Sequence, residues 1–211
     1  MAGKKQFDES TALVCATEQF RRGGYANTSI HDLAKATGLS RSSLYATFGT
    51  KEKFFLRVLE TYCPQMMARL IPDNGLPPTL ALRRYLAETL DALEGFGDAG
   101  GCLVTNTLGE AGNIPASVQE RVTLALEQQA DQLETFLIEA RRRGNLPAAA
   151  NVNHLANYFV ALRQSLGLMW RSGTPRRQLD EIIEISLDVL APGQGRISVV
   201  ADDRNANKRH R

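Results

Sequence analysis

Residues 28–53, TSIHDLAKATGLSRSSLYATFGTKEK, have the pattern of two short helices joined by a tight turn and followed by a further helix. Ser29 precedes Asp32 by three residues, so a side-chain oxygen can cap a helix N-terminus while an acidic residue occupies its first turn. Gly38 ends this helix, because a left-handed C-terminal cap costs glycine almost nothing. Ser40 begins the next helix after a turn of only a few residues. The stretch therefore predicts a helix-turn-helix.

The second helix of this pair, residues 41–46, is expected to turn short and basic side chains outward. Leu44 faces inward, while Arg41, Ser42 and Ser43 point elsewhere. We predict that these three residues face base edges in the major groove of DNA, where arginine and hydroxyl groups can hydrogen-bond to bases. The predicted phosphate contacts are Thr28, Tyr45, Thr47 and Lys51. The full predicted DNA-binding set is Thr28, Ser29, Ser40, Arg41, Ser42, Ser43, Tyr45, Thr47 and Lys51.

The order and spacing of these residues resemble the DNA-binding domain of the TetR family of transcriptional regulators. Ser42 stands where the family pattern has a small residue, often glycine, and Thr47 where it often has histidine. Both departures bear on which operator is read and neither affects the fold. The resemblance covers about the first quarter of the chain and rests on Phe20, Gly24, Tyr25, Thr28, Ser29, Ile30, Leu33, Ala34, Gly38, Leu39, Ser40, Leu44, Tyr45, Phe48, Lys51 and Glu52.

The composition of the 211 residues is that of an ordinary globular protein, with 43% apolar and 23% charged residues. No uncharged apolar run approaches about 18 residues, and the N-terminus has no apolar signal core, so we expect a cytoplasmic protein without a membrane span. Cys15, Cys63 and Cys102 lie far apart without a CxxC pair, and the three histidines are isolated. The sequence therefore predicts no disulfide framework, no metal site and no cofactor.

Charge is distributed unevenly along the chain. The net charge is +4 over residues 1–57, −5 over residues 58–190 and +3 over the remainder. A basic module on an acidic body suits a protein that places one end on phosphate and keeps the other end away from it. We divide the chain into a helix-turn-helix DNA-binding domain (1–57), a ligand-sensing and dimerisation domain (58–192) and a tail (193–211) that is expected to be mobile.

The predicted elements are all helical. A first helix, residues 8–22, braces the helix-turn-helix, and a helix beginning after Thr50 contains Pro64, which should kink or break it. Body helices are predicted at residues 80–93, 102–112, 116–143, 152–171 and 176–190. Strand-like alternation is confined to the short ISVV of the tail. The sequence predicts an all-α fold, in which a long helix joins the N-terminal three-helix domain to the helical body.

The helix at residues 152–171 is apolar nearly all round, so it must be covered on both sides. Two apolar helices at the end of the body suit a two-fold, four-helix interface, and the TetR resemblance implies that the last two helices form the dimer. We predict that helices 152–171 and 176–190 pair across the dimer axis. Substituting aspartate for Ile183 or Leu187 is predicted to abolish the dimer and operator binding together.

A ligand pocket is predicted between the long helix 116–143 and the apolar helix 152–171. Asn106 or Arg163 would serve as polar anchors in it. Ordinary core packing is the alternative for every member of this set. The predicted lining is Tyr85, Phe136, Phe159, Met169 and Trp170.

The stretch GGCLVTNTLGEAG, residues 100–112, resembles a TetR-family branch that includes repressors responsive to electrophiles such as N-ethylmaleimide. Cys102 would lie at a helix N-terminus, where the dipole stabilises a thiolate, and Gly100 and Gly101 would leave its sulfur open. Cys102 is therefore the candidate sensor. A cysteine that only packs in the core is the alternative.

These features predict a homodimeric repressor that a small molecule or a reactive electrophile releases from a palindromic operator. No G-x-S-x-G, phosphate loop or H-E-x-x-H motif occurs in the chain, and no convergent acid and base can be named. Two alternatives remain at this point: a small-molecule carrier with a vestigial helix-turn-helix, and a helical enzyme. Salt-sensitive binding to one palindromic DNA site would separate the regulator from both.

Overall fold

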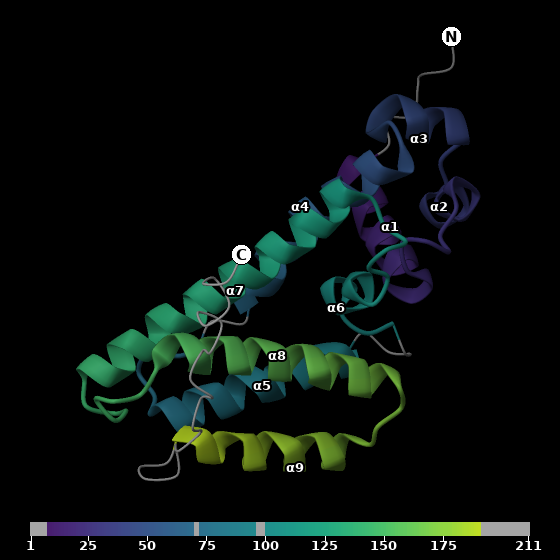
Figure 1. The fold of residues 1–211 in the computed structure, drawn as a ribbon. Coiled ribbons are helices and arrows are strands. Elements are labelled where there is room, and N and C mark those ends of the chain that lie inside the picture. The colour runs from purple at the N-terminus through teal and green to yellow at the C-terminus, as the bar shows by residue number, and fades with distance from the viewer. Residues whose placement is uncertain (1–7, 70–71, 96–99, 191–211) are drawn as a thin grey trace, which may run out of the picture.

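The computed structural model describes residues 8–69, 72–95 and 100–190, and over these ranges it is helical and contains no strand (Figure 1). The all-α prediction is confirmed for this part of the chain. The predicted tail, with its ISVV segment, lies outside the described residues. The helices are α1 (Glu9–Gly23), α2 (Ile30–Thr37), α3 (Arg41–Phe48), α4 (Lys51–Arg69), α5 (Pro78–Gly95), α6 (Leu103–Leu108), α7 (Ala116–Arg142), α8 (Val152–Arg171) and α9 (Arg176–Ser186), which a 3-10 turn (Leu187–Leu190) extends.

The helix ends of the helix-turn-helix follow the predicted capping chemistry. The Ser29 hydroxyl accepts the Asp32 amide while the Asp32 carboxylate accepts the Ser29 amide, which completes a capping box. Gly38 takes the left-handed conformation at φ 70° and ends α2. Ser40 accepts the amide of Ser43 and begins α3. These local signals fix the turn between α2 and α3 before any long-range packing is considered.

An aromatic cluster holds the N-terminal helices together. The Phe20 and Phe55 rings pack edge to face with centroids 4.6 Å apart, and the Tyr25 ring lies 5.1 Å from that of Phe55. Phe48 of α3 stacks on Phe54 of α4 at 3.9 Å. Full burial of one large apolar side chain contributes roughly 1.5–3 kcal/mol, so this cluster makes a rigid base for α2 and α3.

The sequence predicted a kink or a break at Pro64; helix α4 continues through this residue, which excludes the break, and the kink stays a prediction. Proline removes one amide donor and pushes away the carbonyl four residues earlier, here that of Glu60. Both Pro64 and Glu60 are exposed, so water can solvate the released carbonyl. Because the break is avoided, α4 runs uninterrupted from the N-terminal domain into the body.

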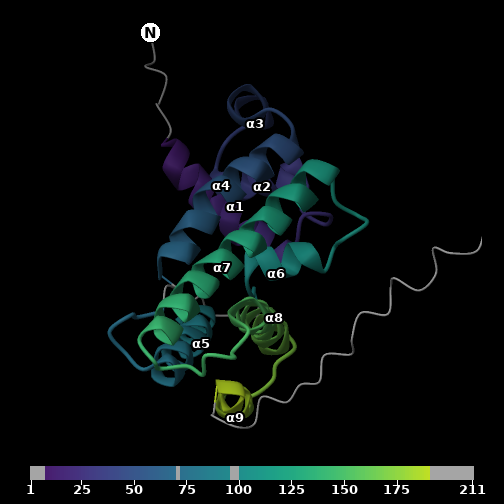
Figure 2. The same ribbon diagram turned by 60° about the vertical axis from the view of Figure 1, so that its left-hand side comes forward.

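The body consists of the long helix α7 packed against α4 and α8, with α5 and α9 packed beside α8 (Figures 1 and 2). Helix α7 falls within the predicted range 116–143, and its buried side includes Val118, Val122, Leu133 and Leu137. The predicted helix 102–112 is shorter than expected, because α6 ends at Leu108 and the chain then turns. Within the described ranges, no helix is both long enough and apolar enough to cross a membrane.

Candidate nucleic-acid interface and its connection to the body

The N-terminal end of α3 is the exposed part of the helix-turn-helix. Leu44 and Phe48 are 1% and 4% exposed and anchor the inner side of α3, while Arg41 and Ser42 are exposed and Ser43 is half-buried. Nη2 of Arg41 lies 3.2 Å from Nδ1 of His31 on α2. The arginine is therefore held at the surface by the neighbouring helix, and its remaining donors are available to bases.

Hydroxyl groups surround the start of α3. The Ser40 hydroxyl lies 2.8 Å from the hydroxyls of both Ser42 and Ser43. Further along the helix, Tyr45 is 53% exposed and Thr47 is also exposed. The structure thus brings the predicted base-facing and phosphate-facing residues of α3 onto one exposed helix, with the partial positive charge of a helix N-terminus at one end.

Thr28, Ser29 and Lys51 occupy positions different from those expected of DNA contacts. Thr28 is 1% exposed and its hydroxyl donates to the Gly24 carbonyl at 2.6 Å, so the prediction that this side chain reaches phosphate is wrong for this structure. The exposed Ser29 donates its hydroxyl to Asp32 at 2.6 Å and serves the helix cap. In this structure the Thr28 hydroxyl is committed to the scaffold, while Ser29 combines its capping role with an exposed position.

Lys51 is half-buried and points back into the N-terminal domain. Its ammonium donates to the Tyr25 carbonyl at 3.0 Å and lies 4.3 Å from the centre of the Tyr25 ring. Burial lowers the pKa of Lys51, against the opposing charge of Glu110. In this structure Lys51 secures the corner between α1 and α2, which corrects its predicted role as a phosphate contact.

Lys53 is a candidate phosphate contact that the sequence analysis missed. It is exposed in the first turn of α4 and lies on the side opposite Lys51. The sequence contains a signal for this difference, because Lys51 precedes Phe55 by four residues and shares its helix face. Phe55 is fully buried, so the residue one turn before it also faces inward.

Large apolar side chains are exposed on both α8 and α9. Leu168 is 61% exposed, Tyr158 is 37% exposed and Ile185 is 71% exposed. In contrast, Ile183 and Leu187 are 2% and 4% exposed and pack inside the single chain. The choice of Ile183 and Leu187 as interface residues was therefore wrong, because the inward stripe of α9 binds its own domain.

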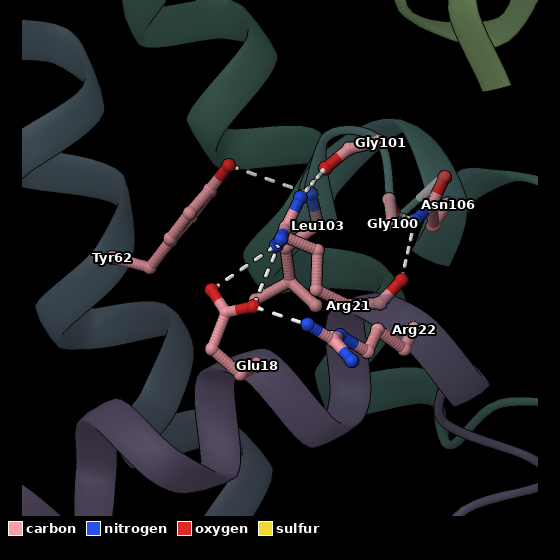
Figure 3. A network of polar contacts seen from close by, with 8 residues as sticks. All are labelled: Glu18, Arg21, Arg22, Tyr62, Gly100, Gly101, Leu103 and Asn106. Atoms are coloured by element: carbon pink, nitrogen blue, oxygen red, sulfur yellow. Dashed lines mark hydrogen bonds and ion pairs between the residues drawn. The ribbon is translucent and has the colours of Figure 1, made fainter. Parts of the chain in front are cut away.

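A buried arginine connects the end of α1 to the loop before α6 (Figure 3). Arg21 is fully buried, and its Nη1 donates to the Gly101 carbonyl at 3.1 Å while Nη2 pairs with Glu18 at 2.8 Å. In return, the Asn106 side-chain amide donates to the Arg21 carbonyl at 2.9 Å and to the Gly100 carbonyl. Asn106 thus joins α6 to the DNA-binding domain, which corrects its predicted role as a pocket anchor.

A second connection lies after α6. The Glu110 carboxylate accepts the Tyr25 amide at 2.9 Å and the Ala26 amide at 2.6 Å. The Ser117 hydroxyl, at the start of α7, donates to Glu52 at the start of α4. Together with Arg21, these bonds attach the segment around α6 to the corner that positions α2.

Cys102 immediately precedes α6, as predicted. It is only 6% exposed, so the expectation that its sulfur is open to solvent is wrong. The flanking glycines make room for other groups, since a Cβ at Gly100 would lie 2.8 Å from the Arg21 guanidinium. The Tyr62 hydroxyl donates to the Cys102 sulfur at 3.7 Å. Burial acts to raise the pKa of Cys102, but the charge of Arg163 and the hydrogen bonds outweigh it, and the pKa lies below its ordinary value.

The predicted pocket residues divide into a polar group and ordinary core. Arg163 is 3% exposed, donates to Gln129 and to the Thr89 hydroxyl, and lies over the Tyr85 ring at 5.9 Å. The side chains without a described polar role are Phe136 and Phe159, which are buried, and Met169 and Trp170, which are half-buried. The structure therefore brings Arg163 and Tyr85 together with Gln129 and Thr89, which the sequence analysis did not select.

Comparisons with known proteins give consistent results along the chain. The model described as "Bacterial regulatory proteins, tetR family" matches residues 13–58, and the model described as "Tetracyclin repressor-like, C-terminal domain" matches residues 78–184. The protein named "Uncharacterized HTH-type transcriptional regulator YezE" of Bacillus subtilis is 30% identical over 197 residues, covering 90% of this chain and 100% of its own. The HTH-type transcriptional repressor ComR of Escherichia coli is 29% identical over 192 residues, covering 87% and 89%.

A similar arrangement is found in a solved structure. A cysteine mutant of the TetR family regulator CifR, complexed with a 26-base-pair operator, superposes with a TM-score of 0.77 at 24% identity, covering 89% of this chain and 99% of its own. At this identity the likeness shows the fold alone.

Proposed function

This chain belongs to the TetR family of transcriptional regulators, and we propose that it is a homodimeric repressor that binds a palindromic operator and is released by a small molecule. The observation that carries the proposal is the exposed N-terminal end of α3, where Arg41 and Ser42 stand outward on a rigid aromatic base. The relative named HTH-type transcriptional repressor ComR supports the same role. Family membership favours the regulator over the carrier and the enzyme.

In this proposal α3 lies in the major groove and its residues have separate roles. Arg41 and Ser42 meet base edges, while Tyr45 and Thr47 meet phosphates beside them. Lys53 replaces Lys51 as the lysine that meets phosphate, because only Lys53 is exposed. The exposed residues of α3, together with Lys53, combine positive charge with hydrogen-bond donors. This combination suits contacts with DNA phosphates and with the edges of the bases between them.

Two copies of the chain would associate through the outer surface of α8 and α9. Leu168 and Ile185, at 61% and 71% exposed, are large apolar side chains that a partner would cover. A two-fold protein reads a two-fold site, so the two α3 helices should lie about one DNA turn apart, roughly 34–36 Å. We keep the division into a DNA-binding domain, residues 1–57, and a sensing and dimerisation domain, residues 58–192, as part of this proposal.

The signal would be received in the body and transmitted through α6. Arg21, Asn106 and Glu110 tie the α6 segment to the N-terminal domain, so a ligand that moves α6 also moves the base of the helix-turn-helix. Such a ligand must bind the free and DNA-bound forms with different affinities. A coupling of about 1–3 kcal/mol would suffice, and DNA must then weaken the ligand equally.

Cys102 remains the candidate receiver of an electrophilic signal. Its lowered pKa favours the thiolate. The thiolate would add to the carbon-carbon double bond of a maleimide and form a new sulfur-carbon bond. The resulting carbanion would then take a proton from water. Because Cys102 is 6% exposed, the reagent must enter through an opening of the body. Bulk added at this position would displace α6, whose first residue follows Cys102 directly.

The proposal is tested by selecting the DNA fragments that the purified protein retains from its own genome. We expect one or a few palindromic sites with half-sites one turn apart, bound by a dimer with an affinity that falls steeply with salt. Retention of fragments without a shared two-fold sequence would contradict the proposal. Adding N-ethylmaleimide to the parent and to Cys102→Ser then tests the receiver, because equal release from the operator would exclude Cys102.

A further inference from the structure

The interior of the body contains a charged side chain held by neutral partners. Arg163, in the middle of α8, is 3% exposed. Its Nε donates to the Thr89 hydroxyl at 3.3 Å, its Nη1 donates to the Gln129 side-chain oxygen, and its Cζ lies 5.9 Å from the centre of the Tyr85 ring. We call these four residues the Arg163 cluster. They come from α5, α7 and α8, so the guanidinium is fixed from three sides.

This buried cation has no carboxylate partner in the described part of the chain. The ion pairs formed by residues 8–69, 72–95 and 100–190 do not include Arg163, and it donates its hydrogen bonds to the neutral side chains of Thr89 and Gln129. The other deeply buried arginine, Arg21, has the carboxylate of Glu18 at 2.8 Å. A buried charge without a carboxylate partner is costly, and an anion that binds beside it offsets part of that cost.

A second arginine near the same interior also has an unused donor. Nη1 of Arg121, on α7, is buried and has no hydrogen-bond partner among the described residues. The charges of Arg121 and Cys102 both act on Cys63, and the charge of Arg163 acts on Cys102. The positive charges of Arg121 and Arg163 therefore act on these two thiols inside a domain whose net charge is negative.

We propose that the Arg163 cluster binds the carboxylate of an organic acid, and that this acid is the inducer. The inference rests on the proposed function, since it names the chemical class of the ligand that releases the repressor from DNA. Guanidinium is suited to a carboxylate because its donors form a planar fork. Gln129 and Thr89 already hold the fork in one orientation, so little order is lost when the acid binds.

The surroundings indicate that the rest of the acid is apolar. The helices that carry the cluster also carry fully buried apolar residues within one turn of its members. These are Leu86 and Leu90 on α5, and Phe159 and Leu166 on α8. A monocarboxylic acid with a hydrocarbon chain would present one charge to Arg163 and place its remainder among apolar side chains. An uncharged analogue of the same shape gains only the apolar part of this interaction.

The thiolate of Cys102 and the bound carboxylate compete for the positive charge of Arg163. Both carry negative charge and both are stabilised by Arg163, so a bound carboxylate must raise the pKa of Cys102 and slow its alkylation. Slowed alkylation in the presence of an acid therefore reports occupation of the cluster. The matching amide carries no charge and should leave the alkylation rate unchanged.

The experiment titrates the full chain with sodium salts of straight-chain acids from acetate to octanoate, and with the matching amides, at constant ionic strength. The melting temperature, the rate of Cys102 alkylation and operator binding are followed in each titration. Arg163→Gln removes the charge, and Gln129→Glu keeps Arg163 while giving it an internal carboxylate. Arg177→Gln, with an 86% exposed side chain on α9, is the matched control.

We expect at least one acid to raise the melting temperature saturably, to bind tenfold or more tightly than its amide and to release the operator. The control should behave as the parent, while Gln129→Glu and Arg163→Gln should each lose at least tenfold in affinity for the acid. Equal binding of acid and amide by the parent, or undiminished binding of the acid by Gln129→Glu, would overturn the inference. Stabilisation without release of the operator would overturn the inducer role. If the parent binds no operator before any acid is added, the proposed function itself fails.

Discussion

Alanine at position 100 should break the connection between α6 and α1. A Cβ at Gly100 would lie 2.8 Å from both Cζ and Nη1 of Arg21 and 3.1 Å from its Nη2. A flexible side chain could ordinarily move aside, but Arg21 is fully buried and bound to Glu18 and the Gly101 carbonyl. The guanidinium can make room only by giving up at least one of these bonds.

The size of the effect follows from two costs that overlap. Extra volume in a packed interior costs about 1–3 kcal/mol, and a lost hydrogen bond to a charged group costs about 1.5–3 kcal/mol. Because the side chain moves to relieve the clash, the two costs are alternatives rather than a sum. We expect Gly100→Ala to lower the free energy of unfolding by about 2 kcal/mol.

A double-mutant cycle with Arg21→Ala identifies the source of this cost. Urea unfolding is measured for the parent, both single variants and the double variant at one protein concentration, because a dimer's stability depends on concentration. With the guanidinium absent, Gly100→Ala should cost less than about 0.5 kcal/mol, which gives a coupling of about 1.5 kcal/mol.

Gly95→Ala is the control substitution, because a Cβ there meets no atom of the described residues within 4 Å and its φ is ordinary. This variant should be neutral or slightly stabilising. An equal cost of Gly100→Ala with and without Arg21 would refute the reasoning, since the clash would then lie with another group.

Three further expectations follow from the structure. Ile185→Asp should dissociate the dimer and leave the chain folded, whereas Ile183→Asp should cost about 3–5 kcal/mol by burying an unpaired charge, and sedimentation with circular dichroism separates the two. Lys53→Ala should lower the salt slope of DNA binding by about 0.9, while Lys51→Ala should leave the slope unchanged and lower stability by about 1 kcal/mol. Cys102 should react with N-ethylmaleimide at pH values below the ordinary thiol pKa, because its thiolate persists until the pH falls to its own lowered pKa. An alkylation profile that follows an ordinary thiol would contradict this expectation.

Local chemistry made most of the helix-turn-helix predictable. Ser29, Asp32, Gly38 and Ser40 act on backbone groups within a few residues of themselves, so their spacing is sufficient to place α2 and α3. Pro64 shows the opposite case. Whether a proline breaks a helix depends on how the released carbonyl is solvated, and that depends on a surface that only the packed structure defines.

The sequence separated inward from outward residues less well. On α9, Ile183 and Ile185 have the same chemistry, yet their exposures are 2% and 71%. Only the position of α9 against its own domain decides which of the two is free for a partner. Arg21 and Asn106 were missed as a connection because 85 residues separate them in the chain, and no periodicity links such distant positions.

The central claim, that α3 reads bases, is tested most directly by the affinities of the parent and Arg41→Ala for the selected operator and for a scrambled DNA of equal length. The account predicts that Arg41→Ala loses about 1–3 kcal/mol on the operator and much less on scrambled DNA, so that the ratio between the two affinities falls. Lys53→Ala, measured beside it, should weaken both DNAs alike. Equal losses on operator and scrambled DNA for Arg41→Ala would contradict the claim and leave Arg41 as a phosphate contact.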